Sequence, residues 1–365
     1  MNVLVVNAGS SSVKLSLLDG EDRVLAAREL EHGAAVEPLG AADAVGHRIV
    51  HGGERFRAAV RIDTEVERQL RELADLAPLH QRKSLDALDA VTKALPEVPA
   101  VACFDTAFHA TLPPAAATYA LPREWRERWG LRRYGFHGLS HAWIARRAPE
   151  LLDRPAAELR IVSCHLGAGA SLCAIAGGRS VDTTMGFTPL EGLVMASRSG
   201  SVDPGLVLWL AERERLSPEE LTDALEHRSG LLGLAGSADM RAVLTRADGG
   251  EADARLALDV YLHRLRAGIA AMAAAMDGLD ALVFTGGVGE HAPAVRAGAA
   301  AGLRFLGVEL DAARNGAATA DSELGAPGAA VRTLVVQARE DLEIARQVRA
   351  LGKMTVLHTR GHEAS

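Results

Sequence analysis

Two short stretches of the sequence combine small and polar residues in a way that suits phosphate binding. One is Asn7-Ala-Gly-Ser10-Ser-Ser12-Val-Lys14, and the other is His165-Leu-Gly-Ala-Gly-Ala-Ser171. Each lies between two mostly apolar runs, which predicts a β-hairpin with a tip of small residues. Small side chains leave the backbone N–H groups of a tip open to phosphate oxygens, and Lys14 adds positive charge. The repeat predicts two related halves that serve one polyphosphate.

Neither tip matches the GxxxxGK[ST] pattern of a Walker P-loop. A third glycine-rich stretch, Thr285-Gly-Gly-Val-Gly-Glu290, follows an apolar strand pattern and precedes a helical one. The acidic residue of a Rossmann fingerprint is not evident about 20 residues further on. We therefore interpret this stretch as a nucleotide contact, with a packing turn as the alternative.

Three arginines are candidates to bind an anion: two lie close to glycines and the third lies two residues after Asp239. An arginine in a glycine-flanked loop is able to clamp a carboxylate or phosphate with two hydrogen bonds. The three are Arg48, Arg198 and Arg241, and the alternative for each is a solvated surface group. Asp105 ends an apolar strand pattern, where it is a candidate ligand of metal-bound water, a candidate base, or a turn or N-cap residue.

His137 lies between Phe136 and Gly138 and is either a core histidine or a donor that stabilises a transferring phosphoryl group. Glu340 precedes the last helical pattern. A carboxylate there either binds metal or favours the positive end of the helix dipole.

The elements that must position these residues alternate strand and helix patterns. Hairpins are predicted at 1–20 and 161–177, strands at 44–50, 100–104, 281–284 and 332–336, and helices at 63–95 (interrupted at Pro78), from about 141 to 147, 204–227, 251–276 and 340–351. Such an order predicts mixed sheets covered by helices, with a cleft between two halves. We expect one domain at 1–148, completed by a helix at about 340–358, and a second at 149–339.

Composition is consistent with an enzyme of two domains. The chain has 365 residues, of which 48% are hydrophobic and 24% charged, and its net charge is −7. Without a long basic stretch, nucleic acid is not expected as a partner. No basic segment precedes the first apolar run, and the apolar stretch 267–276 is too short for a bilayer, so neither secretion nor a membrane is expected. The three cysteines lack metal-ligand spacing and suit buried thiols in the cytoplasm.

A series of motifs in order from residue 6 to residue 290 resembles the acetate kinase family, within the acetate and sugar kinase, heat-shock and actin superfamily. The motifs are Val6–Ser12, His47–Glu54, Ala77–His80, Phe104–His109, Arg133–His141, Cys164–Gly167, Asp182–Gly192, Arg198–Gly200, Ser229–Gly233 and Thr285–Glu290. The resemblance implies an α/β fold of two duplicated ribonuclease H-like (actin-like) domains, each a mixed five-stranded sheet with flanking helices. It also implies a homodimer that makes acetyl phosphate and ADP from acetate and ATP with Mg²⁺ or Mn²⁺.

The resemblance also implies roles for individual residues. Asp105, His137 and Arg198 are then catalytic, and Asn7 and Glu340 bind the metal. Acetate is held by Arg48 and by an apolar pocket of Val50, Leu79, Phe136 and Pro189. ATP is contacted by Ser10, Ser12, Lys14, His165, Leu166, Gly167, Ala168, Gly169, Asp239, Met240, Arg241, Gly287, Val288, Gly289, Glu290 and His291.

The chain departs from the family pattern in four places. Gln81-Arg-Lys-Ser84 replaces the usual Asn-Pro-x-Asn, which leaves acyl specificity open. Ala168 replaces an asparagine in the second tip, which leaves the phosphate donor open. Gln337–Asp341 replaces a Pro-Thr-Asn-Glu-Glu stretch but keeps Glu340 in register, and the chain is shorter than usual.

Three alternatives to an acetate kinase remain. A propionate kinase would need a smaller residue near Val50, and none is evident. A pyrophosphate-using variant is suggested by Ala168. A non-catalytic nucleotide-binding regulator would have no need of the carboxylate clamp that Arg48, Asp105, His137 and Arg198 suggest.

Overall fold

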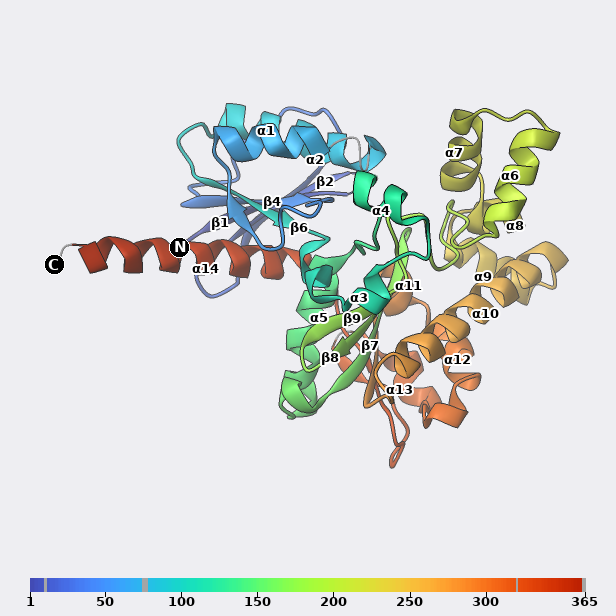
Figure 1. The fold of residues 1–365 in the computed structure, drawn as a ribbon. Helices are drawn as coiled ribbons and strands as arrows, with labels where there is room; N and C mark the ends of the chain where they lie inside the picture. The colour runs from blue at the N-terminus through green and yellow to red at the C-terminus, as the bar shows by residue number, and fades with distance from the viewer. Residues whose placement is uncertain (10–11, 74–77, 320, 363–365) are drawn as a thin grey trace. The chain divides into compact units, whose positions relative to one another are not determined.

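The computed structural model describes residues 1–9, 12–73, 78–319 and 321–362, with the backbone alone for residues 78–80 and 353–362. The chain forms two compact units (Figure 1). The first contains Met1–Ala110, Phe136–Trp143 and Arg339–Ser365, and the second contains Thr111–Gly135 and Ile144–Ala338. These units divide the chain differently from the expected boundary at 148, because 111–135 and 144–148 cluster with the second unit.

The first unit is built on a six-stranded sheet in the order β3-β2-β1-β4-β6-β5. Its strands are β1 (Val3–Ala8), β2 (Val13–Leu18), β3 (Val24–Leu30), β4 (Ala44–Ile49), β5 (Val60–Arg61) and β6 (Ala100–Phe104). The β1–β2 and β2–β3 pairs are antiparallel, and β4 pairs in parallel with β1 and β6. The predicted first hairpin is confirmed.

The second unit repeats this plan: counted from the β9 edge, its sheet has the order β9-β8-β7-β10-β12-β11. Its strands are β7 (Arg160–Leu166), β8 (Ala170–Ala176), β9 (Arg179–Thr183), β10 (Ala281–Thr285), β11 (Ser322–Glu323) and β12 (Arg332–Val335). The β7–β8 hairpin occupies the place of β1–β2, and β10 pairs in parallel with β7 and β12. The prediction of two related halves is therefore confirmed, because the two sheets have the same order of strands.

Each sheet has six strands, so the expected number of five was wrong. The additional strands are β5 and β11, which are two residues long and pair antiparallel with β6 and β12 at the sheet edges. A two-residue strand shows no alternation of apolar and polar residues, and sequence patterns do not reveal it.

Helices and 3₁₀ turns account for most of the remaining chain. In the first unit they are α1 (Thr64–Glu72), α2 (Pro78–Ala94) and α14 (Glu340–His362). The 3₁₀ turn η2 (Ala107–Thr111) and α5 (Gly138–Leu152) each begin in the first unit and end in the second. Those of the second unit are α3 (Pro114–Ala117), α4 (Arg123–Trp129), η3 (Ala156–Glu158), α6 (Pro204–Arg213), α7 (Pro218–His227), α8 (Gly230–Ala235), α9 (Met240–Asp248), α10 (Ala252–Ala274), α11 (Gly286–His291), α12 (Pro293–Ala301), η4 (Arg304–Leu306) and α13 (Ala312–Ala317).

Helices cover both faces of the first sheet. On one face Val3, Val5 and Leu18 pack against Ile344 and Val348 of α14. On the other face, the residues packed around α2 are Leu4, Val6, Leu15, Val45, Ala87 and Val91. Burial on both faces explains why β1 is apolar almost throughout, with the sequence Val-Leu-Val-Val-Asn-Ala.

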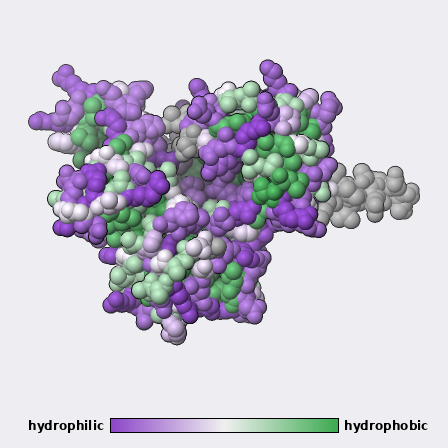
Figure 2. Space-filling model, turned by 180° about the vertical axis from the view of Figure 1, so that it is seen from behind, coloured by the Kyte–Doolittle hydropathy of each residue, from purple (hydrophilic) through white to green (hydrophobic). Residues whose placement is uncertain are grey.

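The alanine-rich stretch 267–276 lies mostly in α10, whose Ile269, Met272 and Ala273 are buried, as predicted. Much of the surface in the view of Figure 2 is hydrophilic, and apolar residues gather there in separate patches. Among the residues that the structure describes, no helix has both the length and the apolar character needed to cross a membrane.

Candidate active site

Arg48 and Asp105 form a buried ion pair at the ends of two neighbouring parallel strands. Nη2 and Nε of Arg48 lie 2.6 and 3.0 Å from Oδ2 of Asp105. The side chains are 13% and 1% exposed. The register of β4 and β6 pairs Arg48 with Cys103, so Asp105 follows β6 one step beyond the ladder. The sheet therefore brings together two of the predicted site residues.

The opposite charges of Arg48 and Asp105 counteract the effect of burial on the pKa of each group. Burial raises the pKa of Asp105, and the neighbouring Arg48 charge pulls it back only in part. Burial lowers the pKa of Arg48, but the carboxylates of Asp105 and Glu340 outweigh it and raise the net value. Oδ1 of Asp105 is buried and has no hydrogen-bond partner among the described residues. This oxygen is therefore a candidate ligand for a cation or a bound water.

Asn7 and Glu340 extend the same cluster. Nδ2 of Asn7 donates to Oε2 of Glu340 at 2.7 Å, and Nη1 of Arg48 donates to Oδ1 of Asn7 at 3.1 Å. Asn7 is near the end of β1 and Glu340 begins α14, which packs on the same sheet. Four predicted site residues, Asn7, Arg48, Asp105 and Glu340, thus form one network within the first unit.

The first tip contributes less to this network in the structure. The β1–β2 register places Lys14 opposite Asn7, and Lys14 is exposed. Gly9 N–H donates to the Ser12 carbonyl at 2.8 Å, which closes the turn. Oγ of Ser12 donates to Glu29. Ser10 lies outside the described residues.

His137 is held at the start of α5 in an uncommon conformation. Its φ is +56°, in the left-handed region that non-glycine residues rarely adopt. The next residue, Gly138, donates its N–H to the Asp105 carbonyl at 2.9 Å. A Cβ at Gly138 would lie 2.0 Å from that oxygen, so only glycine fits there. The strain at His137 therefore accompanies a tight contact with the Asp105 backbone.

The apolar residues predicted around acetate lie partly in this unit. Val50 is 8% exposed and Phe136 is 2% exposed. The Phe136 ring meets the His51 ring edge-on, with the centroids 5.5 Å apart. Leu79 is in the first turn of α2, and its side chain lies outside the described residues. The fourth predicted residue, Pro189, is buried in the second unit.

Arg198 is fixed in a loop of the second unit. Its Nε lies 3.4 Å from Oε2 of Glu226, and its Nη1 donates to the Pro189 carbonyl at 3.1 Å. Both charged side chains are largely buried, at 13% and 10% exposed. The loop also touches the second tip, since Ala196 N–H donates to the Ala168 carbonyl at 3.1 Å. Arg198 and the second tip are therefore neighbours.

The second tip and the glycine-rich stretch also lie side by side. Thr285 pairs with His165 across β10 and β7. Gly286 has a φ of +77°, and a Cβ there would lie 2.8 Å from the Leu166 carbonyl. Gly287 has open space around it, so a ligand is able to approach its backbone. The side chain of Leu166 is fully buried, which leaves its backbone for any contact with a ligand.

The segment Asp239–Arg241 is mainly a helix cap. Oδ1 of Asp239 accepts the Arg241 N–H at 3.0 Å at the start of α9, and Met240 points into the core at 4% exposed. The Arg241 side chain is 88% exposed and pairs with Asp239. Its geometry agrees with the surface alternative, although ligand contact stays a prediction.

Comparison with known proteins assigns the family. A sequence model of the acetokinase family matches residues 23–346. The chain belongs to the acetokinase family. The resemblance inferred from the motifs is thereby confirmed, and this acetokinase-family member is a kinase.

Curated and solved acetokinase relatives cover most of the chain. The chain is 52% identical to the acetate kinase of Gloeobacter violaceus over 305 residues, which span 83% of this chain and 75% of the relative. The crystal structure of Porphyromonas gingivalis acetate kinase superposes with a TM-score of 0.87 at 36% identity, covering 98% and 99% of the two chains. A propionate kinase from Francisella tularensis gives 0.88 at 33% identity, covering 95% and 98%.

Sequence reasoning assigned no role to Gln81, which contacts the residue after Val50, a predicted acetate-binding residue. Gln81 is fully buried, and its Oε1 accepts the His51 N–H at 3.1 Å while its Nε2 donates to the His51 carbonyl at 3.3 Å. These bonds fix the backbone directly after Val50. The only sequence signal was the departure of residues 81–84 from the family pattern.

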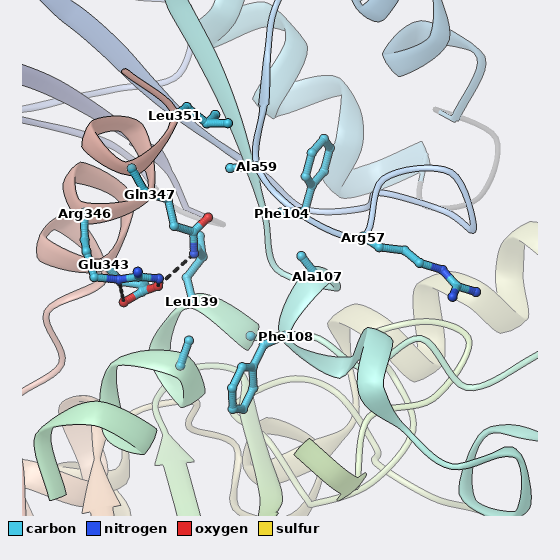
Figure 3. A pocket seen from close by; sticks show the side chains of 14 residues that line it. Arg57, Ala59, Phe104, Ala107, Phe108, Leu139, Glu343, Arg346, Gln347 and Leu351 are labelled. Atoms are coloured by element: carbon cyan, nitrogen blue, oxygen red, sulfur yellow. Dashed lines mark hydrogen bonds and ion pairs between the residues drawn. The ribbon is translucent and has the colours of Figure 1, made fainter. Parts of the chain in front are cut away.

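A second missed residue anchors the start of α14 in this acetokinase. Glu343 is fully buried and holds Nη2 of Arg346 at 2.7 Å and Nε2 of Gln347 at 2.8 Å. Figure 3 shows these bonds beside a cavity of about 300 Å³. Phe104 and Gly138, the neighbours of Asp105 and His137, also line that cavity. The cluster thus supports the helix that begins at Glu340.

Proposed function

We propose that this chain catalyses reversible phosphoryl transfer from ATP to acetate, which gives acetyl phosphate and ADP by direct in-line transfer with Mg²⁺. The observation that carries the proposal is the network of Asn7, Arg48, Asp105 and Glu340. It combines a guanidinium able to hold a carboxylate with oxygen ligands suited to a hard cation. A site that only binds nucleotide has no need of this combination.

Each unit has its own part in this proposal. In the first unit Arg48 holds the acetate carboxylate. The apolar residues assigned to its methyl group are Val50, Leu79 and Phe136 of the first unit and Pro189 of the second. In the second unit the tip at His165–Gly169 and the stretch Gly287–His291 hold the ATP phosphates. Phosphoryl transfer requires the attacking and leaving oxygens to be in line, so positioning supplies most of the rate.

The transferring group spreads negative charge over its three equatorial oxygens. Arg48, Arg198 and His137 are the donors that we assign to this charge. A carboxylate oxygen is already a nucleophile at neutral pH, so the reaction needs no strong base. Asp105 therefore orients Arg48 and holds cation or water, and does not remove a proton.

The donor set fits a magnesium ion. Asn7 and Glu340 offer amide and carboxylate oxygens, and Oδ1 of Asp105 is a buried oxygen with no partner among the described residues. Within the described residues no three acidic, histidine or cysteine side chains form a metal cluster. Mg²⁺ commonly takes one or two carboxylates and completes its shell with phosphates and water. When bound, it neutralises phosphate charge.

Two features bear on the substrates. The propionate kinase of Francisella tularensis shares the fold, but the buried Val50 and Phe136 of this chain favour the smaller acid. Ala168 is exposed at the second tip and offers no side-chain donor, which favours a test of pyrophosphate as the phosphate donor.

We also propose that the protein acts in the cytoplasm as a homodimer. Three buried free thiols are compatible with a reducing compartment. Leu206, Leu208 and Trp209 of α6 are 47%, 71% and 56% exposed, which is unusual for large apolar side chains on one helix. Sedimentation of the wild type and of Trp209→Glu tests self-association through α6.

Acyl hydroxamate formation tests the proposed reaction. Acetate, propionate and butyrate are each offered with ATP or with pyrophosphate, in the presence and absence of Mg²⁺. We expect acetate with ATP and Mg²⁺ to give the highest kcat/KM. Absence of turnover with every pair would sink the proposal, and preference for pyrophosphate would replace ATP as donor.

A further inference from the structure

A cavity of about 330 Å³ lies in the first unit, on the face of the sheet that α2 covers. Its walls come from β4, the β5–α1 connection, the second half of α2 and the loop before β6. Side chains of neighbouring strand residues point to opposite faces. His47 of β4 therefore faces this cavity, whereas the next residue, Arg48, faces the side where it meets Asp105.

His47 is a buried polar side chain that makes no hydrogen bond within the described part of the chain. It is 1% exposed, and neither Nδ1 nor Nε2 has a hydrogen-bond partner among the described residues. Buried polar groups in folded proteins nearly always have one. Burial lowers the pKa of His47 to about 3, so at neutral pH the ring is uncharged. A neutral imidazole keeps one nitrogen as an acceptor, and no described residue donates to it.

The charged groups around the cavity are mostly acidic. The cavity is lined by Arg61 and by the carboxylates of Asp63, Glu67 and Glu97. Oδ1 of Asp63 accepts the Val66 N–H at 2.8 Å, and Glu67 pairs with Arg71. Glu97 has no ion pair within the described part of the chain. One cation against three carboxylates leaves a net negative charge, which favours a positively charged ligand.

The remaining wall is apolar and suits a short hydrocarbon. It is formed by Leu88, Val91, Leu95 and Val98 together with the prolines at 96 and 99. The volume lies at the lower end of the range for small-molecule sites, about 300–1,000 Å³. The ligand is therefore small, with a charged head and an aliphatic body.

We propose that this cavity binds a small aliphatic primary ammonium compound, with His47 as its anchor. The ammonium donates to the unprotonated ring nitrogen of His47 and faces the carboxylates, and the hydrocarbon packs on the α2 side.

Calorimetry on the intact chain tests this site with n-butylammonium as the probe and 1-butanol as its uncharged counterpart. Neither ATP nor acetate is present, so the outcome is independent of the kinase reaction. We expect n-butylammonium to bind at least tenfold more tightly than 1-butanol and to shift the NMR signals of the His47 ring. His47→Leu should weaken binding at least tenfold.

Two further variants keep the test decisive. Glu97→Lys reverses an unpaired carboxylate of the cavity wall and should weaken binding at least fivefold even if His47→Leu fails to fold. Asp89→Asn removes an exposed carboxylate of α2 outside the cavity and should bind as the wild type does. Absence of binding by the wild type, equal binding of 1-butanol, or unchanged binding by the Glu97→Lys variant overturns the proposal.

Discussion

Arg48 grips a single oxygen of Asp105 with two of its nitrogens, at 2.6 and 3.0 Å, and leaves the other oxygen buried without a hydrogen bond among the described residues. The arginine proposed to bind acetate is thus already oriented by the aspartate. Orientation of this kind lowers the cost of organising the site when substrate arrives.

Arg48→Lys should retain the positive charge but lose the paired hydrogen bonds from two nitrogens to Asp105. We expect kcat/KM for acetate to fall by roughly a hundredfold, about 3 kcal/mol, in the hydroxamate assay. Arg48→Ala leaves Asp105 buried and unpaired, so it should also lower the free energy of unfolding by about 3–5 kcal/mol. Arg68→Lys, in an exposed ion pair, is the control, and equal losses in both lysine variants would contradict the assignment.

Arg198→Ala should abolish turnover while nucleotide binding survives, because the guanidinium is assigned to the transferring phosphoryl group. The expected loss in kcat is about a hundredfold or more, with the Kd for ADP within about threefold of the wild type. Fluorescence titration and thermal melting check this, with the exposed Arg228→Ala as control. A joint loss of nucleotide binding and thermal stability would instead mark Arg198 as structural.

The side chain of Glu290 is predicted to act through its hydrogen bonds, which leaves the Glu290 backbone for the proposed contact with ATP. Its Oε1 accepts the N–H groups of Gly286 and Ala338, both at 2.9 Å. Glu290→Gln keeps an acceptor oxygen and should leave the KM for ATP nearly unchanged, whereas Glu290→Ala should raise it about tenfold. If the negative charge itself contacts the nucleotide complex, the glutamine variant will be as damaging as the alanine variant.

Gln81 should influence acyl selectivity without touching substrate. Gln81→Leu removes both bonds to the His51 backbone and loosens the wall at Val50. We expect the ratio of kcat/KM for acetate over propionate to fall by about tenfold. Gln69→Leu, on the exposed face of α1, is the matched control. An unchanged ratio in the Gln81 variant, with a folded protein, would rule out this role.

His47 should make the free energy of unfolding depend on pH. Its folded pKa of about 3 lies below the ordinary value of 6.5, so its contribution is present above pH 6.5 and is lost as pH falls toward 3. Between pH 7 and pH 5 the free energy of unfolding should fall by about 2 kcal/mol on its account. Urea unfolding of the wild type and of His47→Leu checks this, since the variant should lack that part of the slope.

Much of the scaffold was predicted correctly, because its longer strands and helices and its turns are specified by short stretches of sequence. The tips at 7–12 and 165–171 carry turn residues between apolar runs, and both are hairpins in the structure. The two-residue strands β5 and β11 escaped because they depend on pairing with distant strands. Residues 251–276 were predicted as one helix, which ends at Ala274 in the structure.

The site was harder to predict, since its contacts join distant residues. Asn7 and Glu340 are 333 positions apart, and only the resemblance to a family suggested that they belong together. Glu226 and Glu343 belong to no motif, and Gln81 was noted only as a departure from one. Their burial and their partners therefore became visible only in the fold. The helix cap at Asp239 was not predicted, because no helical pattern was assigned to residues 240–248, and it became visible only in the structure.

The three buried cysteines allow the local unfolding of each unit to be measured by thiol modification. Cys103 is buried in β6 of the first unit, and Cys164 and Cys173 are buried in β7 and β8 of the second. Burial raises the pKa of all three, that of Cys173 to about 12, so a thiol reagent modifies them only when a strand separates. The rate at which each thiol of the intact chain is labelled would therefore report which unit unfolds locally more often. Labelling with a substrate present would show which unit that substrate stabilises.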